Sequence, residues 1–248
     1  MKAIILAAGV GKRLAAVAGG RPKCLIEIGG QTLLKRHLSN FANLGIMDVV
    51  IVVGYEQQRI REAVIASDFP GTVNFVINER YTRGSITSFW EARSEIDDDV
   101  VMMDADVLYH PDILRRLVES PRPNALLIDE TVAQETEECM VAIENERVTC
   151  LSKTLPATYD FAGEGVGFLK VCQSDVRTLI QSVQGPIEAG QLDLEYEDAL
   201  KSFFDTVVVG YERIGGLPWI EIDFPEDIQR AESEVLPAFS SRAKEKVV

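Results

Sequence analysis

The chain has 248 residues, 46% of them hydrophobic, and a formal net charge of −14 with a pI near 4.7. This length and composition suit one sizeable domain with a buried core. The acidic average surface would repel the phosphate backbone of nucleic acids, so we expect no nucleic-acid partner.

The four cysteines lack the close paired spacing of a zinc site, and a domain of this size does not need disulfides to fold. We therefore expect reduced cysteines that act as packing residues. The N-terminus shows no signal-peptide pattern, and no uninterrupted apolar run reaches the length of about 18 residues that a membrane helix needs. These features predict a cytoplasmic protein with no membrane partner.

Apolar runs of strand length alternate with helical patterns through the first half of the chain. The expected strands are residues 3–6, 49–53, 73–77 and 100–103. Apolar residues at helical spacing lie between them, at residues 33–44, around Ile60 and Val64, and at residues 85–96. This alternation predicts an α/β fold, a Rossmann-like three-layer sandwich whose sheet is mostly parallel and covered on both faces.

The pattern changes after about residue 124. The segment MVAIENERVTCLSK predicts a hairpin that turns at Asn145-Glu146 and adds a small antiparallel extension to the mixed sheet. Further on we expect helices at residues 173–183 and 194–204, and strands near residues 206–211 and 219–222. A last helix begins at Pro225, with Asp223 well placed as its cap.

A turn with the sequence LAAGVGKRL follows the first strand, from Leu6 to Leu14. It fails the P-loop pattern, because Arg13 follows Lys12 and because Leu6 stands where the first glycine belongs. It also fails the dinucleotide fingerprint, because Leu14 replaces the third glycine.

What remains is a strand end with small residues, where backbone N–H groups can approach an anion. The residues concerned are Leu6, Ala7, Ala8, Gly9 and Gly11. Arg13 adds a planar fork of donors, so the turn suits a triphosphate. An ordinary glycine-rich turn with exposed cations is the alternative for the loop taken alone.

The pattern continues beyond the turn with Pro22-Lys23 and then LIEIGGQTLL. In this combination the chain resembles the nucleotidyltransferases that join a nucleoside triphosphate to a phosphorylated small molecule, the sugar-phosphate and phosphocholine-type pyrophosphorylases. The spacing from Arg13 to Pro22 agrees with that family, although Ala18 stands where threonine is usual. The resemblance reaches about residue 236 and includes DAD (104–106), LSK (151–153), GEGVGF (163–168) and WIEIDFPEDIQRA (219–231).

The resemblance implies that Asp106 and Asp223 bind magnesium. Glu221 alternates with Asp223 and so shares its strand face, and we expect it to contact the metal through water. We expect Asp104 to orient a backbone group or a metal-bound water. Magnesium prefers carboxylate and phosphate oxygens and keeps several waters, so one or two aspartates suffice. The alternatives are that Asp106 caps a loop and that Asp223 only caps the helix at Pro225.

The resemblance also assigns three cations to phosphates: Lys23 to the α-phosphate, Arg13 to the departing pyrophosphate, and Lys153 to the phosphate of the acceptor. The reaction brings anions together, so its barrier is largely electrostatic and positional. Without the resemblance, a lone lysine such as Lys153 would be read as a solvated surface charge. No general base is required, and His37, on an apolar helix face, is expected in the core.

Residues 77–92 stand at the family's place for base and ribose recognition. We expect Asn78 and the Gly84-Ser85 turn to contact the base; the alternative is a strand-to-helix connection that Ser85 caps. The phosphocholine-type branch often carries paired asparagines here, whereas this chain has GSITS.

The closing W-x-E-I-D pattern and the LEYEDAL segment at residues 194–200 favour the cytidylyltransferase branch. Carboxylates and aromatic rings in that branch receive an amine or a quaternary ammonium group. The acceptor-binding candidates are Glu164, Glu195, Glu197, Asp198 and Trp90. For the acidic residues of the LEYEDAL segment, a solvated helix face is the alternative.

We therefore expect magnesium-dependent transfer of CMP from CTP to phosphocholine, 2-aminoethylphosphonate or a similar small acceptor, with release of pyrophosphate. The alternatives are a sugar-1-phosphate nucleotidyltransferase that uses UTP, GTP or dTTP, and a catalytically silent nucleotide-binding regulatory subunit. The expected organisation is one domain over residues 1–236, with a nucleotide-binding half (1–123), an acceptor-binding half (124–236) and a tail (237–248). A homodimer is compatible with this organisation.

Overall fold

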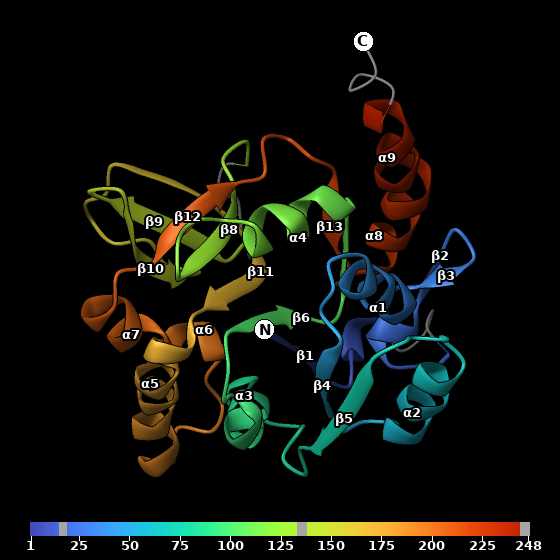
Figure 1. Cartoon of the computed structure of the whole chain (residues 1–248), viewed down its shortest axis with the longest axis horizontal. Helices are drawn as coiled ribbons and strands as arrows, with labels where there is room; N and C mark the ends of the chain where they lie inside the picture. Colours follow the sequence, from blue (N-terminus) through green and yellow to red (C-terminus); the bar gives the residue numbers. More distant parts are fainter. Residues whose placement is uncertain (15–18, 133–137, 244–248) are drawn as a thin grey trace.

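A computed structural model describes residues 1–14, 19–132 and 138–243. Within these residues, a nine-stranded sheet runs through the molecule and helices lie on both of its faces (Figure 1). Seven strands follow the order β10-β9-β11-β6-β1-β4-β5, while β8 pairs with β11 and with β12. The α/β architecture with a mixed, mostly parallel centre confirms the fold expected from the sequence.

The parallel part of the sheet comes from the first half of the chain. Its strands are β1 (Lys2–Ala7), β4 (Asp48–Val53), β5 (Thr72–Ile77) and β6 (Val100–Asp104). β1 lies between β4 and β6, and Leu6 pairs with Asp104 at the carboxyl ends of β1 and β6. The glycine-rich turn and the DAD segment therefore begin at the same edge of the sheet, where ligands of open α/β folds bind.

The antiparallel part comes from the second half. Its strands are β8 (Ala125–Asp129), β9 (Met140–Glu144), β10 (Arg147–Ser152) and β11 (Phe161–Val171), and β12 (Gly210–Arg213) runs parallel to β8. Asn145 and Glu146 have φ values of 50° and 61°, as a tight hairpin turn with two left-handed residues requires. The predicted hairpin is confirmed. β11 joins the two parts, because it pairs with β6, β8 and β9.

The helices divide between the two faces of the sheet. One face packs against α1 (Leu33–Asn43), α2 (Gln57–Ile65) and α4 (Pro111–Val118). The other packs against α3 (Ile86–Ala92), α5 (Val176–Glu188), α6 (Tyr196–Ala199) and α7 (Lys201–Thr206). Both faces of the central strands are buried, which explains why β1 and β4 read as almost continuous apolar runs.

Two short antiparallel pairs complete the strands: β2 (Glu27–Ile28) with β3 (Gln31–Thr32), and β7 (Val107–Tyr109) with β13 (Trp219–Glu221). The second pair brings the C-terminal segment against the segment that follows β6 (Figure 1). None of the helices in the described part of the chain has both the length and the apolar character that crossing a membrane requires.

The last helices begin with α8 (Pro225–Arg230) and end with α9 (Leu236–Ala243), which extends into the segment expected to be a tail. The prediction that Asp223 caps α8 is wrong, because Phe224 occupies the N-cap position. Asp227 explains the difference: its Oδ2 atom accepts hydrogen bonds from the backbone N–H groups of Asp223 and Phe224, at 3.0 and 2.7 Å. The Asp223 side chain therefore does not cap α8 and is available for other contacts.

Candidate active site

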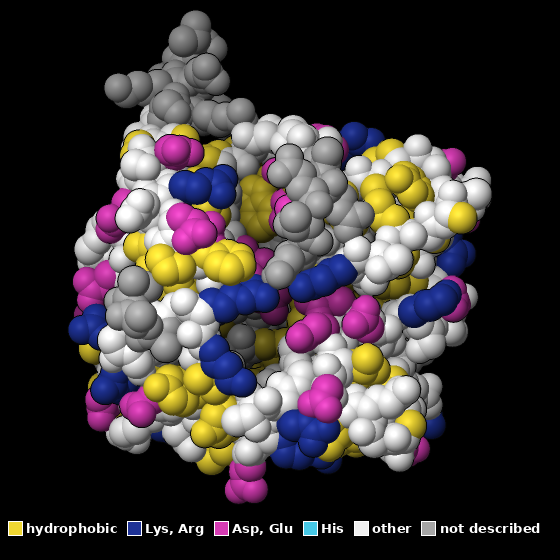
Figure 2. All heavy atoms as spheres, turned by 180° about the vertical axis from the view of Figure 1, so that it is seen from behind, with side chains coloured by type: hydrophobic (Ala, Val, Ile, Leu, Met, Phe, Trp, Pro, Cys, Tyr) yellow, Lys and Arg dark blue, Asp and Glu magenta, His cyan; other side chains and the backbone are white. Residues whose placement is uncertain are grey.

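A cavity of about 1610 Å³ opens at the carboxyl edge of β1 and β6. The segments that line it include the glycine-rich turn, the DAD segment, residues 164–169 of β11, residues 195–198 and residues 216–221. Figure 2 shows basic and acidic side chains that gather around a hollow in one face of the molecule. The cavity thus brings together segments from both halves of the chain.

The glycine-rich turn lies on the cavity wall as predicted, and Leu6, Ala7, Ala8, Gly9, Gly11 and Arg13 all line it. Gly11 has a φ of 61°, and a Cβ atom at this position would lie 2.8 Å from Cγ of Lys23. A glycine is therefore required here, both for its left-handed backbone and because the stem of Lys23 crosses directly over it.

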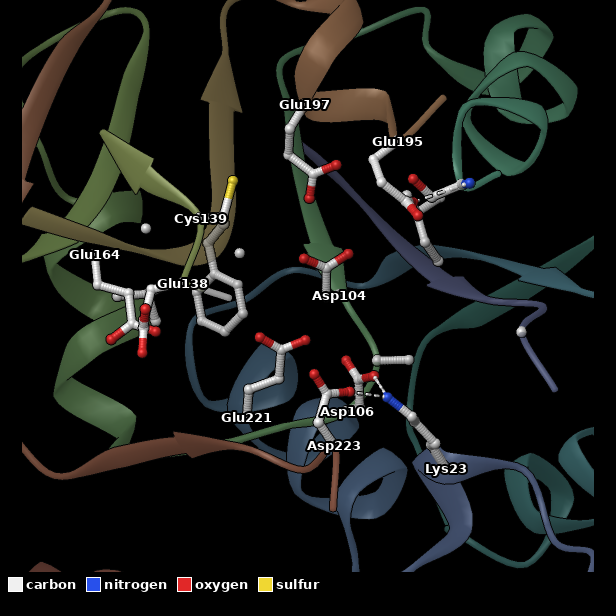
Figure 3. Close-up of a pocket in the computed structure, with 18 of the residues that line it drawn as sticks. Lys23, Asp104, Asp106, Glu138, Cys139, Glu164, Glu195, Glu197, Glu221 and Asp223 are labelled. Atoms are coloured by element: carbon white, nitrogen blue, oxygen red, sulfur yellow. Dashed lines mark hydrogen bonds and ion pairs between the residues drawn. The ribbon is translucent and has the colours of Figure 1, made fainter. Parts of the chain in front are cut away.

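Lys23 reaches the centre of the site from a short 3₁₀ turn, Lys23–Leu25. Its ammonium group donates to Oδ2 of Asp106 at 2.9 Å and to Oδ1 of Asp223, as the dashed lines in Figure 3 show. Burial alone would lower the pKa of Lys23, but the two carboxylates raise it above its usual range. Lys23 is therefore a firmly held cation between two of the predicted metal ligands.

Asp106, Glu221 and Asp223 each offer one carboxylate oxygen, and these oxygens all lie within 4.8 Å of one another. The β7–β13 pair creates this cluster: Val107 pairs with Glu221, and the N–H of Ile222 donates to the carbonyl of Asp106 at 3.0 Å. Carboxylate oxygens at this spacing suit a hard divalent cation such as magnesium. The ammonium of Lys23 already acts as a stand-in cation at two of the three carboxylates.

The remaining carboxylates near this cluster have shifted pKa values. The Glu221 side chain is accessible to solvent from the cavity. The protein atoms around its carboxylate, and the charges of Asp106 and Asp223, nevertheless raise its pKa to about 8. Burial and the neighbouring Glu197 raise the pKa of Asp104 well above its usual range. The hydroxyl of Tyr196 donates to Oδ2 of Asp104 at 3.3 Å. Asp104 thus links β6 to the segment that contains Tyr196.

The opposite side of the cavity has a different charge pattern. Glu164 on β11 lies beside Glu138 there, away from Lys23 (Figure 3). Burial, and then the charges of Glu138 and Asp129, raise the pKa of Glu164 to about 7. Oδ2 of Asp129 accepts a hydrogen bond from Nε1 of Trp219 at 2.9 Å, which fixes the indole in the cavity wall.

Sequence reasoning missed Glu138, Asp129 and Trp219 as cavity residues. Trp219 and Asp129 meet across 90 positions of the sequence, so no local pattern identifies the pair. The one available signal was the W-x-E-I-D segment itself: Trp219 and Glu221 share a strand face, so a metal-site role for Glu221 places the indole nearby.

Residues 195–198 form the third acidic part of the cavity, and Lys153 lies on the same cavity wall. Burial and the charges of Glu195 and Asp198 raise the pKa of Glu197 to about 7. Oε2 of Glu195 accepts a hydrogen bond from the backbone N–H of Ser85 at 3.2 Å. The predicted acceptor segment is therefore attached to the turn predicted to read the base.

Three predicted site residues lie outside this cavity. Asn78 is completely buried, and its amide donates to the hydroxyls of Thr87 and Ser88 at 2.9 and 3.0 Å, while its Oδ1 accepts from the backbone N–H of Arg80. These bonds make Asn78 a structural link between β5 and α3. The prediction that Asn78 reads the base does not fit this arrangement.

Gly84 and Trp90 are the other two. A Cβ atom on Gly84 would lie 2.0 Å from the carbonyl oxygen of Leu194, so this glycine permits close contact between two backbones. Trp90 carries the guanidinium of Arg93 over its ring at 4.2 Å, away from the cavity. Ser85 does line the cavity, and its hydroxyl accepts from the backbone N–H of Tyr196 at 2.8 Å instead of capping α3.

His37 lies in the core, as expected from its place on an apolar helix face, with no exposed surface. Burial lowers its pKa to about 4, so the ring is neutral. Its Nε2 atom lies 3.1 Å from the carbonyl oxygen of Ala105. A neutral ring that donates to this carbonyl supports the DAD segment from beneath.

Comparison with known proteins identifies relatives of this chain. CMP-5′-(3-aminopropyl)phosphonate synthase from Streptomyces rubellomurinus is 33% identical over 128 residues, which cover 51% of this chain and 20% of that protein. The bifunctional IPC transferase and DIPP synthase from Rubrobacter xylanophilus is 30% identical over 237 residues, which cover 94% of this chain and 52% of that protein. The chain thus spans about half or less of the length of these relatives.

The solved structure of CTP:phosphocholine cytidylyltransferase from Streptococcus pneumoniae has the same fold, with a TM-score of 0.74 and 20% identity over 93% of this chain and 97% of that chain. Residues 3–169, more than half of the chain, match the MobA-like NTP transferase domain. This match confirms the family expected from the sequence, and the chain belongs to the MobA-like NTP transferase domain family.

Proposed function

We propose that the protein transfers CMP from CTP to a small phosphorylated or phosphonate acceptor of the phosphocholine or 2-aminoethylphosphonate type, with release of pyrophosphate. The convergence of Lys23, Asp106 and Asp223 beside the glycine-rich turn carries this proposal. The names of the relatives support the choice of nucleotide, since the Streptomyces enzyme makes a CMP-linked phosphonate and the Streptococcus enzyme uses CTP.

The chemistry needs positive charge and position more than it needs a base. An oxygen of the acceptor's phosphate or phosphonate forms a bond to the α-phosphorus of CTP, while the bond from that phosphorus to the β-phosphate oxygen breaks and pyrophosphate departs. In this reaction Lys23 stabilises the charge that builds on the α-phosphate, Arg13 binds the departing pyrophosphate and Lys153 attracts the acceptor's anionic group. The acceptor is already ionised, so no side chain has to remove a proton.

Asp106, Asp223 and Glu221 would hold magnesium, and their oxygen-only donor set, with the oxygens within 4.8 Å of one another, fits that ion. When bound, the ion would neutralise charge on the phosphate oxygens. The main-chain groups from Leu6 to Gly11, together with Ser85 and Asp104, would bind the nucleotide. All four cysteines are free thiols, which fits work in the reducing cytoplasm, where we place the protein.

The acidic side of the cavity favours an acceptor that carries an amine or a quaternary ammonium group. Glu164 lies in one acidic part of the cavity and Glu195, Glu197 and Asp198 lie in another. Burial and neighbouring carboxylates raise the pKa values of Glu164 and Glu197 to about 7. A cation relieves this repulsion, whereas the neutral hydroxyl groups of a hexose do not. This feature separates the proposal from the alternative of a sugar-1-phosphate substrate.

The test is a matrix of the four ribonucleoside triphosphates and dTTP against phosphocholine, 2-aminoethylphosphonate and hexose-1-phosphates, with pyrophosphate release as the readout and magnesium present. CTP with an amine-bearing acceptor should give the highest kcat/KM. A best pair of UTP and a hexose-1-phosphate would contradict the proposal. Nucleotide binding without turnover for every acceptor would instead indicate a silent regulatory subunit.

A further inference from the structure

Phe224 is a large apolar side chain that lies on the cavity wall with 37% of its surface exposed. Its neighbour Asp223 provides one of the metal-site carboxylates, but Phe224 itself has no role in the chemistry described above. We propose that the Phe224 ring is a positioning residue, which holds the guanidinium of Arg13 where the β- and γ-phosphates of the nucleotide bind. This inference rests on the proposed nucleotide-binding role of Arg13.

The contact between the two side chains comes from segments 211 positions apart in the chain. The central guanidinium carbon of Arg13 lies 4.9 Å from the centroid of the Phe224 ring. An Nη1 atom of the same guanidinium lies 3.8 Å from Oδ2 of Asp223. The face of an aromatic ring attracts a guanidinium group, and such a contact limits the rotamers of a half-exposed arginine.

The ring can act as a fixed support because its backbone is held in place. Asp227 is buried, and its Oδ2 atom accepts hydrogen bonds from the N–H groups of both Asp223 and Phe224. Pro225 then fixes the first turn of α8. One short segment therefore fixes both a carboxylate of the metal site and the support beneath Arg13.

Arg13 needs such a support because about half of its side chain is exposed to solvent. An arginine that already lies in its binding position loses less conformational entropy when a ligand arrives. The benefit applies to the part of the nucleotide that Arg13 binds, which is the pyrophosphate portion. The ring should therefore strengthen the binding of CTP and of inorganic pyrophosphate, and leave the binding of CMP unchanged.

The experiment uses Phe224→Leu, which keeps an apolar side chain but removes the aromatic face, and Phe224→Tyr, which keeps that face. Dissociation constants for CTP, CMP and inorganic pyrophosphate are measured by calorimetry with magnesium present. We expect Phe224→Leu to weaken CTP and pyrophosphate about fivefold, as an attraction of this kind would, and to leave CMP unchanged. Phe224→Tyr should keep the wild-type dissociation constants.

The matched control is Phe75→Leu, which removes a similar stack of Arg61 on Phe75, at 4.3 Å, on a strand outside the cavity. It should change none of the three dissociation constants. A second control combines Phe224→Leu with Arg13→Ala, and the double variant should bind CTP no more weakly than Arg13→Ala alone. Thermal unfolding confirms that each variant is folded.

Unchanged CTP affinity in Phe224→Leu would overturn the inference, as would an equal loss for CTP and CMP or a further loss in the double variant. If the wild-type protein bound neither CTP nor pyrophosphate, the inference would also fall. The proposed function fails by a different result: normal binding of CTP with no turnover of any acceptor would remove it and would leave the role of Phe224 intact.

Discussion

The two ends of the cavity arrange charge in opposite ways. At the end next to the glycine-rich turn, the Lys23 ammonium lies between the carboxylates of Asp106 and Asp223 and bonds to both. At the other end, Glu164 faces Glu138 and Asp129, and the pKa of Glu164 is raised to about 7. One end has an ammonium group among its carboxylates, whereas at the other end the charges that raise the pKa of Glu164 are those of carboxylates.

This difference indicates at which end of the cavity the cationic group of a ligand binds. At the Lys23 end, one ammonium group bonds to two of three clustered carboxylates, whose oxygens suit a divalent metal ion. A cluster of facing carboxylates is destabilised until a cation arrives or a proton binds. We therefore assign the polyphosphate and metal chemistry to the Lys23 end and the amine of the acceptor to the Glu164 end, and the following variants test that assignment.

The largest effect is expected for Asp106→Ala, which removes one carboxylate from the Lys23 end of the cavity. Turnover should fall by about a hundredfold or more, as for the loss of a main electrostatic stabiliser. Steady-state pyrophosphate release measures it, and circular dichroism checks the fold. The control is Asp112→Ala on α4, where the carboxylate pairs with Arg115 at 3.1 Å outside the cavity. Turnover at the wild-type rate in Asp106→Ala would end the metal assignment.

Lys23→Met removes the ammonium group that bonds to Asp106 and Asp223. Turnover should fall by about tenfold or more, because positive charge at the α-phosphate is lost. In the absence of nucleotide, the same variant should bind Mn²⁺ about tenfold more tightly, because the lysine no longer neutralises Asp106 and Asp223. Titration followed by electron paramagnetic resonance measures the affinity. Weaker Mn²⁺ binding than in the wild type would show that the ammonium does not oppose a metal at these carboxylates.

Glu164→Gln tests the Glu164 end of the cavity. The KM for phosphocholine should rise about fivefold at pH 8 while the KM for CTP stays constant, because only the acceptor loses a charge partner. Since the pKa of Glu164 is about 7, the wild-type carboxylate becomes protonated below that pH. The difference in KM between the two proteins should therefore shrink as the pH falls from 8 to 6. A difference that stays constant over this range would mean that Glu164 is not the titrating partner.

The smallest effect is on stability, and its sign is opposite to the usual one for a carboxyl group. The pKa of Glu164 is about 7 in the folded protein, above its value of 4.5 without the fold, so the folded state binds more protons between these two pH values. The stability contributed at low pH is lost as the pH rises from about 4.5 to 7. Glu164→Gln should thus raise the free energy of unfolding at pH 8 by about 1 kcal/mol after allowance for solvent screening.

Urea unfolding at pH 8 and at pH 4.5 measures this change. The two proteins should differ at pH 8 and agree at pH 4.5, where the glutamic acid is largely neutral in the folded state. A destabilised variant at pH 8 would show that Glu164 makes favourable contacts that its charge pattern does not reveal.

The sequence predicted the sheet well because the signal there is local. The central strands are apolar runs of strand length, and the turn at Asn145-Glu146 needs only its own residues to adopt left-handed angles. The residues at the Lys23 end were also found, since motif spacing marks them. His37 was placed correctly, because an apolar helix face predicts burial whatever lies opposite.

The errors arose where a partner distant in sequence decides what a side chain does. Asn78 looked like a base contact until the hydroxyls of Thr87 and Ser88 were seen to use its amide. Asp223 looked like a helix cap, but Asp227 takes that task from within the helix. The role of each side chain depends on which of several nearby polar groups forms the hydrogen bond. The sequence pattern does not show which group this is.

The pairing of β7 with β13 has a consequence for the nascent chain. The β7–β13 pair brings Asp223 to Asp106, and Asp223 lies late in the chain. A growing polypeptide has therefore made all nine strands of the main sheet and the glycine-rich turn before it makes the second carboxylate. The metal and nucleotide binding proposed above therefore requires the segment beyond Trp219. A chain that ends before Trp219 would lack this carboxylate and also Ile220 and Ile222, which pack in the core.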